Sequence, residues 1–165
     1  MRHIISAGII IFRKTDEGIK YLLLYHGHGY WNFAKGKVEH AERSFQTALR
    51  EIREETGLRQ NELKFQPNFK AYERFSFGPK KNLIFKTVIL YLAETKQPVV
   101  KISFEHEGFG WFSFSEAQKL LSKYKDSVAI LRRAQDFLHP KRKGEVLRKK
   151  SPERHPIPAP KQGEL

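Results

Sequence analysis

Apolar residues recur along the chain in two patterns, which predict different elements. Short runs rich in β-branched and aromatic residues are typical of strands. We expect strands at 4–12, 21–25, 31–33, 62–66, 69–77, 83–93 and 109–112. Apolar residues also return every three or four positions between 45 and 52, which predicts an amphipathic helix. Two later helices are expected, capped by Ser115 and Asp126. Together these elements predict an α/β fold, with a mixed β-sheet sandwiched between α-helices.

The apolar pattern stops near His139, and the composition then shifts to Lys, Arg, Pro and Glu. Such a segment cannot bury a core. We therefore expect one domain over residues 1–139 and a basic, Pro-rich, disordered tail over residues 140–165. The simplest interpretation of the tail is a solubilising appendage, and the alternative is an electrostatic arm for RNA or another polyanion, as its basic clusters suggest.

Charge and composition narrow the functional classes. The formal net charge of +13 favours polyanionic partners such as nucleotides or RNA. There is no Cys, which excludes a disulfide framework and a thiolate metal site or nucleophile, and which fits a cytoplasmic location. No apolar run approaches the length of a membrane span, and the first residues do not resemble a signal peptide. We expect a cytoplasmic protein with no membrane partner.

Three carboxylates share one face of the predicted central helix. Glu51, Glu54 and Glu55 follow the spacing i, i+3 and i+4, so they repel one another. They also lie near the helix C-terminus, where the macrodipole disfavours anions, just before Gly57 as the expected αL cap. A divalent cation such as Mg²⁺ or Mn²⁺ would compensate for this repulsion, because hard cations prefer carboxylate oxygens.

The spacing around this helix resembles the Nudix box, in which a Gly, four Glu, an Arg and a second Gly stand at set intervals. The matching positions are Gly36, Glu42, Arg50, Glu51, Ile52, Glu54, Glu55, Gly57 and Leu58. A merely solvated acidic helix face would explain neither Gly36 nor Glu42. The resemblance implies the Nudix fold and metal-dependent hydrolysis of a diphosphate bond in a nucleotide.

The resemblance also implies roles for single residues of the box. The metal, Mg²⁺ or Mn²⁺, would bind Glu51, Glu54, Glu55 and the carbonyl oxygen of Gly36. Glu42 and Arg50 would form a structural ion pair that holds the loop against the helix. The catalytic base varies across this superfamily, and it is either a box glutamate such as Glu54 or a glutamate of a later loop.

Three further stretches are similar to the asymmetrical diadenosine tetraphosphate hydrolases. They are YLLLYHGHGYWNFAKGKVE, KTVILYLAE and FEHEGFGW. The similarity implies that Glu105 is a base or a further metal ligand, that Lys35 and Lys86 bind the polyphosphate, and that Tyr72 stacks on adenine. Glu105 could instead be an ordinary loop acid, and Lys86 an exposed edge charge. Ala34 stands where the subgroup usually has Pro.

The reaction that these patterns favour is the splitting of diadenosine tetraphosphate into ATP and AMP by water. The alternatives are an RNA 5′-pyrophosphohydrolase, a nucleoside triphosphate pyrophosphohydrolase, and a nucleotide- or RNA-binding Nudix protein without turnover. The three box carboxylates argue against the last alternative, because a protein that only binds would not need such repelling charges.

Overall fold

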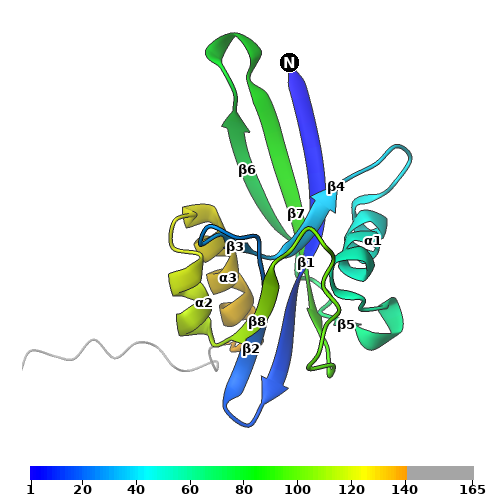
Figure 1. The fold of residues 1–165 in the computed structure, drawn as a ribbon, viewed down its shortest axis with the longest axis vertical. Coiled ribbons are helices and arrows are strands. Elements are labelled where there is room, and N and C mark those ends of the chain that lie inside the picture. Colours follow the sequence, from blue (N-terminus) through cyan, green and yellow to red (C-terminus); the bar gives the residue numbers. More distant parts are fainter. Residues whose placement is uncertain (141–165) are drawn as a thin grey trace, which may run out of the picture.

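The computed structural model describes residues 1–140, so nearly all of the predicted tail lies outside the described residues. Figure 1 shows how the helices and strands are arranged. In chain order they are β1 (Arg2–Thr15), β2 (Gly18–Tyr25), β3 (Trp31–Asn32), β4 (Ala34–Lys37), α1 (Ser44–Thr56), the 3₁₀ turn η1 (Gln60–Glu62), β5 (Lys64–Phe65), β6 (Ala71–Phe77), the 3₁₀ turn η2 (Lys80–Asn82), β7 (Ile84–Glu94), β8 (Gly108–Phe112), α2 (Phe114–Leu120) and α3 (Lys125–Leu138).

All eight strands belong to one mixed sheet, built around a parallel pair. β1 and β7 run parallel from Arg2 opposite Ile84 to Phe12 opposite Glu94. The other pairs are antiparallel, and the outer edge of each long central strand pairs with two shorter strands. β4 and β2 pair with the first and second halves of β1, while β6 and β5 pair with the first and second halves of β7.

Helices cover both faces of this sheet, so the predicted sandwich is confirmed. On one face, α1 packs Ala48 and Ile52 against Ile9 of β1 and its apolar neighbours. On the other face, α2 and α3 pack residues such as Leu121 and Leu131 against the opposite side of the sheet. The middle of β1 is buried on both sides, which explains why its sequence is a continuous apolar run. We call these two sides the α1 face and the α2–α3 face.

One end of the sheet extends beyond the helices. The β6–β7 hairpin and the start of β1 project together from the body of the domain (Figure 1). Residues 74–77 of β6 are exposed, and residues 84–87 of β7 are only partly buried. We call residues 1–5 and 74–87 the sheet extension.

Three local features differ from the sequence prediction. β4 was not expected, and it pairs with β1 at Gly8, where a Cβ atom would overlap the carbonyl of Ala34. The prediction that Ser115 caps α2 is wrong: Ser113 is the cap, and its Oγ accepts a hydrogen bond from the Glu116 N–H. The cap position of α3 is also wrong, because the helix begins at Lys125 and places Asp126 in its first turn. Within residues 1–140, no helix is long and apolar enough to cross a membrane.

Candidate active site

The loop between β4 and α1 is held to the helix by a bidentate ion pair. Arg50 donates from Nε to Glu42 Oε1 at 2.7 Å and from Nη2 to Glu42 Oε2 at 3.1 Å. The Thr47 hydroxyl and the Glu39 N–H also donate to Glu42. These hydrogen bonds, that of Arg50 foremost, lower the pKa of Glu42 to about 2. The ion pair predicted between Glu42 and Arg50 is therefore present.

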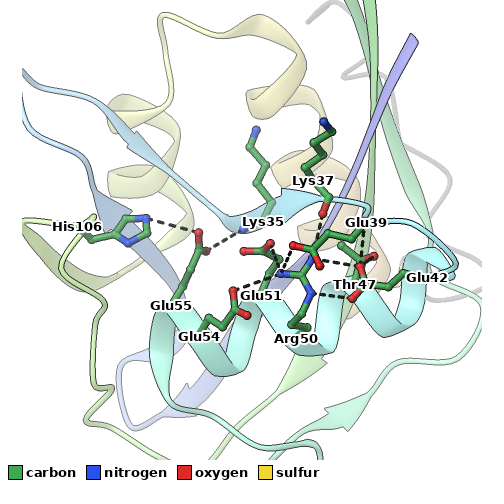
Figure 2. A network of polar contacts seen from close by, with 10 residues as sticks. All are labelled: Lys35, Lys37, Glu39, Glu42, Thr47, Arg50, Glu51, Glu54, Glu55 and His106. Carbon is green, nitrogen blue, oxygen red and sulfur yellow. Dashed lines mark hydrogen bonds and ion pairs between the residues drawn. The ribbon is translucent and has the colours of Figure 1, made fainter.

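The remaining nitrogen of Arg50 binds the acidic face of α1. Its Nη1 donates to Glu51 Oε1 at 2.7 Å and to Glu54 Oε2 at 3.2 Å, as Figure 2 shows. The hydrogen bonds with Glu42 and then Glu51 raise the pKa of Arg50, so the guanidinium stays charged. One cation thus links the loop to two of the three repelling carboxylates.

Gly36 lies directly against the Glu51 carboxylate. A Cβ atom at Gly36 would overlap the carboxyl carbon and both oxygens of Glu51. Only glycine therefore allows the β4 backbone and this carboxylate to approach so closely. Burial raises the pKa of Glu51, and the nearby Glu54 and Glu105 add to the rise while Arg50 opposes it.

Glu55 is the most deeply buried of the three helix carboxylates. Its exposed fraction is 7%, and its Oε2 accepts a hydrogen bond from the Lys35 N–H at 3.0 Å. Burial raises the pKa of Glu55 to about 8, with further contributions from Glu51, Glu105 and Glu54 that the Lys35 hydrogen bond opposes. A buried anion without a full counter-charge is costly, so this carboxyl favours the protonated state or a cation.

The loop before β8 brings two further residues to the same place. Glu105 lies close enough to raise the pKa of both Glu51 and Glu55, although it is itself exposed. His106 is buried, with Nε2 at 3.8 Å from Glu55 Oε1 and Nδ1 hydrogen-bonded to the Ser103 hydroxyl at 3.0 Å. Burial lowers the pKa of His106, which favours the neutral imidazole. We call Gly36, Glu51, Glu54, Glu55 and Glu105 the carboxylate corner.

His106 had no predicted role, and the signal that could have revealed it is its place beside Glu105. Its ring lies 4.5 Å from that of His26, measured between centroids. His26 follows β2, so the two rings pack the loop before β8 onto the body of the domain. His106 thereby supports both the buried Glu55 and the position of Glu105.

The side chain of Lys35 points away from the carboxylate corner, toward the α2–α3 face. Its Nζ lies 3.7 Å from Glu73 Oε2, and the Ser127 hydroxyl of α3 donates to Glu73 Oε1. Lys86 follows the same face of β7, two residues before the Val88 that pairs with Glu73. Burial lowers the pKa of Lys35. The nearby Glu73 carboxylate opposes this shift, whereas the positive charge of Lys86 adds to it. Lys35 and Lys86 are therefore neighbours in one electrostatic environment.

Tyr72 lies on the other side of the sheet from these lysines. It pairs with Ile89 and is contacted by Arg74 and Lys70, which lie 4.9 and 5.8 Å from its ring centroid. The aromatic residue that shares a face with Lys86 is Phe75, its direct cross-strand partner, and the Lys86 Nζ lies 5.9 Å from the Phe75 ring centroid. The sequence prediction did not single out Phe75.

Comparison with known proteins shows which family this chain belongs to. The NUDIX domain model of that family matches residues 2–134. The chain belongs to the NUDIX family. The Nudix domain seen here also matches the expected fold, with the box helix α1 packed on a mixed sheet.

Relatives of this Nudix domain include enzymes named bis(5′-nucleosyl)-tetraphosphatase [asymmetrical]. The Sus scrofa protein is 35% identical over 143 residues, which cover 81% of this chain and 94% of the relative. The Caenorhabditis elegans protein is 31% identical over 137 residues, covering 81% and 95%. A crystal structure of a C. elegans Ap4A hydrolase binary complex has a TM-score of 0.71 and 29% identity, covering 82% of this chain and 98% of that one.

Nudix hydrolases generally need a divalent metal, and the donor chemistry of the carboxylate corner fits one. Four carboxylates lie close enough to perturb one another, and oxygen donors suit hard cations. Within residues 1–140, however, no three acidic or imidazole side chains are arranged to hold an ion. Glu51 and Glu54 point instead to Arg50, so a cation at the corner would compete with this guanidinium for their oxygens.

Proposed function

We propose that this Nudix domain hydrolyses diadenosine tetraphosphate asymmetrically into ATP and AMP. The observation that carries the proposal is the convergence of Glu51, Glu55 and Glu105 beside Gly36, on a chain that is about one-third identical to enzymes of that name. The cytoplasmic location expected from the sequence stays a prediction.

The carboxylate corner would hold the metal, Mg²⁺ or Mn²⁺. Glu51, Glu54, Glu55 and the carbonyl oxygen of Gly36 are the ligands in this proposal. The bound ion would neutralise charge on the phosphate oxygens and lower the pKa of a coordinated water. Arg50 would keep the loop in place through Glu42, because that bidentate contact does not involve the metal ligands.

Glu105 is the base that the geometry favours over Glu54. Arg50 already donates a hydrogen bond to the Glu54 carboxylate. Glu105 has no hydrogen bond or ion pair with a side chain in the described part of the chain, so its oxygens are available to a water. In the proposed step Glu105 accepts a proton as the water oxygen bonds to phosphorus. The bridging P–O bond breaks, and its electron pair leaves with the departing nucleotide.

The remaining charge of the substrate would lie along the α2–α3 face. Lys35 and Lys86 would bind the polyphosphate, because they are neighbouring cations on that face and Lys35 adjoins the corner through its N–H. An adenine would stack on Phe75, beside Lys86, rather than on Tyr72 across the sheet.

One experiment separates this function from its alternatives. Turnover is measured side by side, with Mg²⁺ and with Mn²⁺, on diadenosine tetraphosphate, nucleoside triphosphates and 5′-triphosphorylated RNA. We expect the highest kcat/KM on the dinucleotide, with ATP and AMP as products. A preference for RNA would support the pyrophosphohydrolase alternative, which the basic composition of the chain favours. Binding without turnover of any substrate would support the non-catalytic alternative.

A further inference from the structure

The sheet extension is a basic surface without acidic residues. Neither of its two segments, 1–5 and 74–87, contains Asp or Glu. Its cations are Arg2, Arg74, Lys80, Lys81 and Lys86. None of them forms an ion pair with any residue from 1 to 140. Cations that are concentrated in this way and left unneutralised attract polyanions.

On the α2–α3 face of the sheet extension, aromatic and basic side chains lie side by side. Phe75 and Phe77 alternate along β6, so both point to this face. Across the strands, the row through Phe75 continues to Lys86, and the row through Phe77 continues through Ile84 to Arg2. Both rings are exposed, at 42% and 44%, and their centroids are 6.2 Å apart.

The tip of the extension adds a basic cavity. Met1, Arg2 and residues 80–85 line a cavity of about 790 Å³, so Lys80 and Lys81 surround it together with the first residues of β1. No helix covers this end of the sheet in the described part of the chain (Figure 1). The aromatic rows and the basic tip thus form one open surface.

We propose that the α2–α3 face of the sheet extension binds a single-stranded polynucleotide. Exposed aromatic rings on a sheet stack unpaired bases, and neighbouring Lys and Arg bind the phosphates. The 6.2 Å between the rings is nearly twice the 3.4 Å rise of a duplex strand, so the two rings suit an extended strand better than paired, stacked bases.

Two other occupants fit less well. A second copy of this chain would bring two acid-free, basic extensions together, and they would repel each other. An anionic lipid surface would attract the lysines and could bury the two Phe rings, but it would make no use of their spacing along one strand. The strand direction also leads from Phe77 through Phe75 to Glu73, which contacts Lys35 next to the carboxylate corner. Phe75 and Lys86 are shared with the proposed dinucleotide site, but strand binding requires no hydrolysis, and the test below changes Phe77, Lys80 and Lys81, which that site does not use.

Fluorescence anisotropy with labelled 12-nucleotide strands tests the site. The full chain is titrated in EDTA, so that no hydrolysis occurs, against single-stranded RNA, single-stranded DNA and duplex RNA without 5′-triphosphate. We expect Lys80→Glu/Lys81→Glu to weaken single-strand binding at least tenfold. The slope of log affinity against log salt should fall by about 1.4, since each lost phosphate contact contributes about 0.7. Phe77→Ala should weaken binding at least about fivefold, the lower end for a base–aromatic stack.

A matched control removes the same charge elsewhere. Lys64→Glu/Lys96→Glu alters two exposed lysines near β5, which pairs with the opposite half of β7. We expect this variant to keep most of the affinity, and all variants to keep the wild-type melting temperature. Equal affinities for single-stranded RNA and DNA would show that bases and phosphates alone are recognised. A higher affinity for RNA would indicate an additional contact with the 2′-hydroxyl group.

Several outcomes would overturn the proposal. Equal losses in both double variants would mean that net charge alone governs binding. Duplex RNA bound as tightly as the single strand, or Phe77→Ala without effect, would exclude base stacking. Binding to vesicles of phosphatidylserine but not to either single strand would assign the surface to a membrane.

Discussion

The carboxylate corner and the sheet extension lie on the same sheet but handle charge in opposite ways. The corner gathers four acidic side chains, of which Glu51 and Glu55 are partly or fully buried, and burial and mutual repulsion raise the pKa of these two. The extension itself contains no acidic residue, and it leaves Arg2, Arg74, Lys80 and Lys81 exposed and Lys86 partly buried. Acidic and basic side chains are thus gathered in separate regions of a chain whose net charge is +13.

This difference indicates that the two regions have different roles. Repelling, desolvated carboxylates cost stability, which is reasonable where they will bind a cation or a proton. Exposed cations and aromatic rings cost little, and they offer a surface that polyanions can reach without rearrangement. Lys35 links the two regions. Its backbone N–H donates to Glu55, and its side chain contacts Glu73, which directly precedes the extension on β6.

The largest expected effect concerns chemistry at the corner. Glu105→Gln should lower kcat on diadenosine tetraphosphate by about 10²- to 10⁴-fold, the range for a general base, while most of the metal affinity is kept. Glu107→Gln is the matched control, because this acid lies in the same loop, and it should retain activity. Steady-state kinetics and metal titration measure both effects. An unchanged kcat would remove Glu105 from the site and move the search for the base to Glu54.

The next effect tests how tightly the corner is packed. Gly36→Ala places a Cβ atom on the Glu51 carboxylate and should displace it, with a loss in kcat/KM of about 10²-fold from misplacement. Gly108→Ala is the control, since a Cβ there would meet only Tyr25 Cβ at 3.9 Å, an ordinary contact. Kinetics at saturating metal compare the two. Equal activity of both variants would contradict the close approach of Gly36 and Glu51.

A smaller effect distinguishes the two faces of the sheet. Phe75→Ala should raise KM for diadenosine tetraphosphate about five- to tenfold with kcat nearly unchanged, as expected for the loss of one base stack. Tyr72→Ala, on the α1 face, should change KM less than twofold. Initial rates over a range of substrate concentrations give both values. The reverse order would restore Tyr72 as the residue that stacks on adenine.

The smallest effect concerns stability without metal. Burial raises the pKa of Glu55 in the fold to about 8, from the 4.5 that is ordinary for a glutamate. The stability associated with its neutral form is therefore fully present below about pH 4.5 and is lost as the pH rises through 8. Glu55→Gln, which cannot ionise, should melt near the wild type at pH 5 and a few degrees above it at pH 8.5.

Thermal melts in EDTA at the two pH values measure this difference. Glu54→Gln serves as the control, because it removes an exposed carboxylate from the same helix rather than a buried one. A wild-type melting temperature that rises between pH 5 and pH 8.5, with Glu55→Gln below it at pH 8.5, would show that the Glu55 anion is stabilised in the fold.

Much of the site could be predicted because it is local. The box helix, its αL cap at Gly57, its acidic face and the Glu42–Arg50 pair all depend on spacing within one short segment. The hairpin of β6 and β7 follows from two apolar runs around a turn. Cap positions were harder, since two serines lie at the start of α2, Ser113 just before it and Ser115 in its first turn, and only the backbone shows which hydroxyl accepts the Glu116 N–H.

The sequence by itself determined the resemblance to the Nudix family and the three carboxylates on one face of α1, because both depend on the spacing of residues within one short segment. Only the tertiary structure decided that Gly36 touches Glu51, that His106 lies beside Glu55, and that Phe75 rather than Tyr72 shares a face with Lys86. These contacts depend on the register of β1 with β4 and of β6 with β7. Alternation along a strand shows which of its residues share a face. Only the pairing with other strands and the packing against the helices decide which of these faces carries the site.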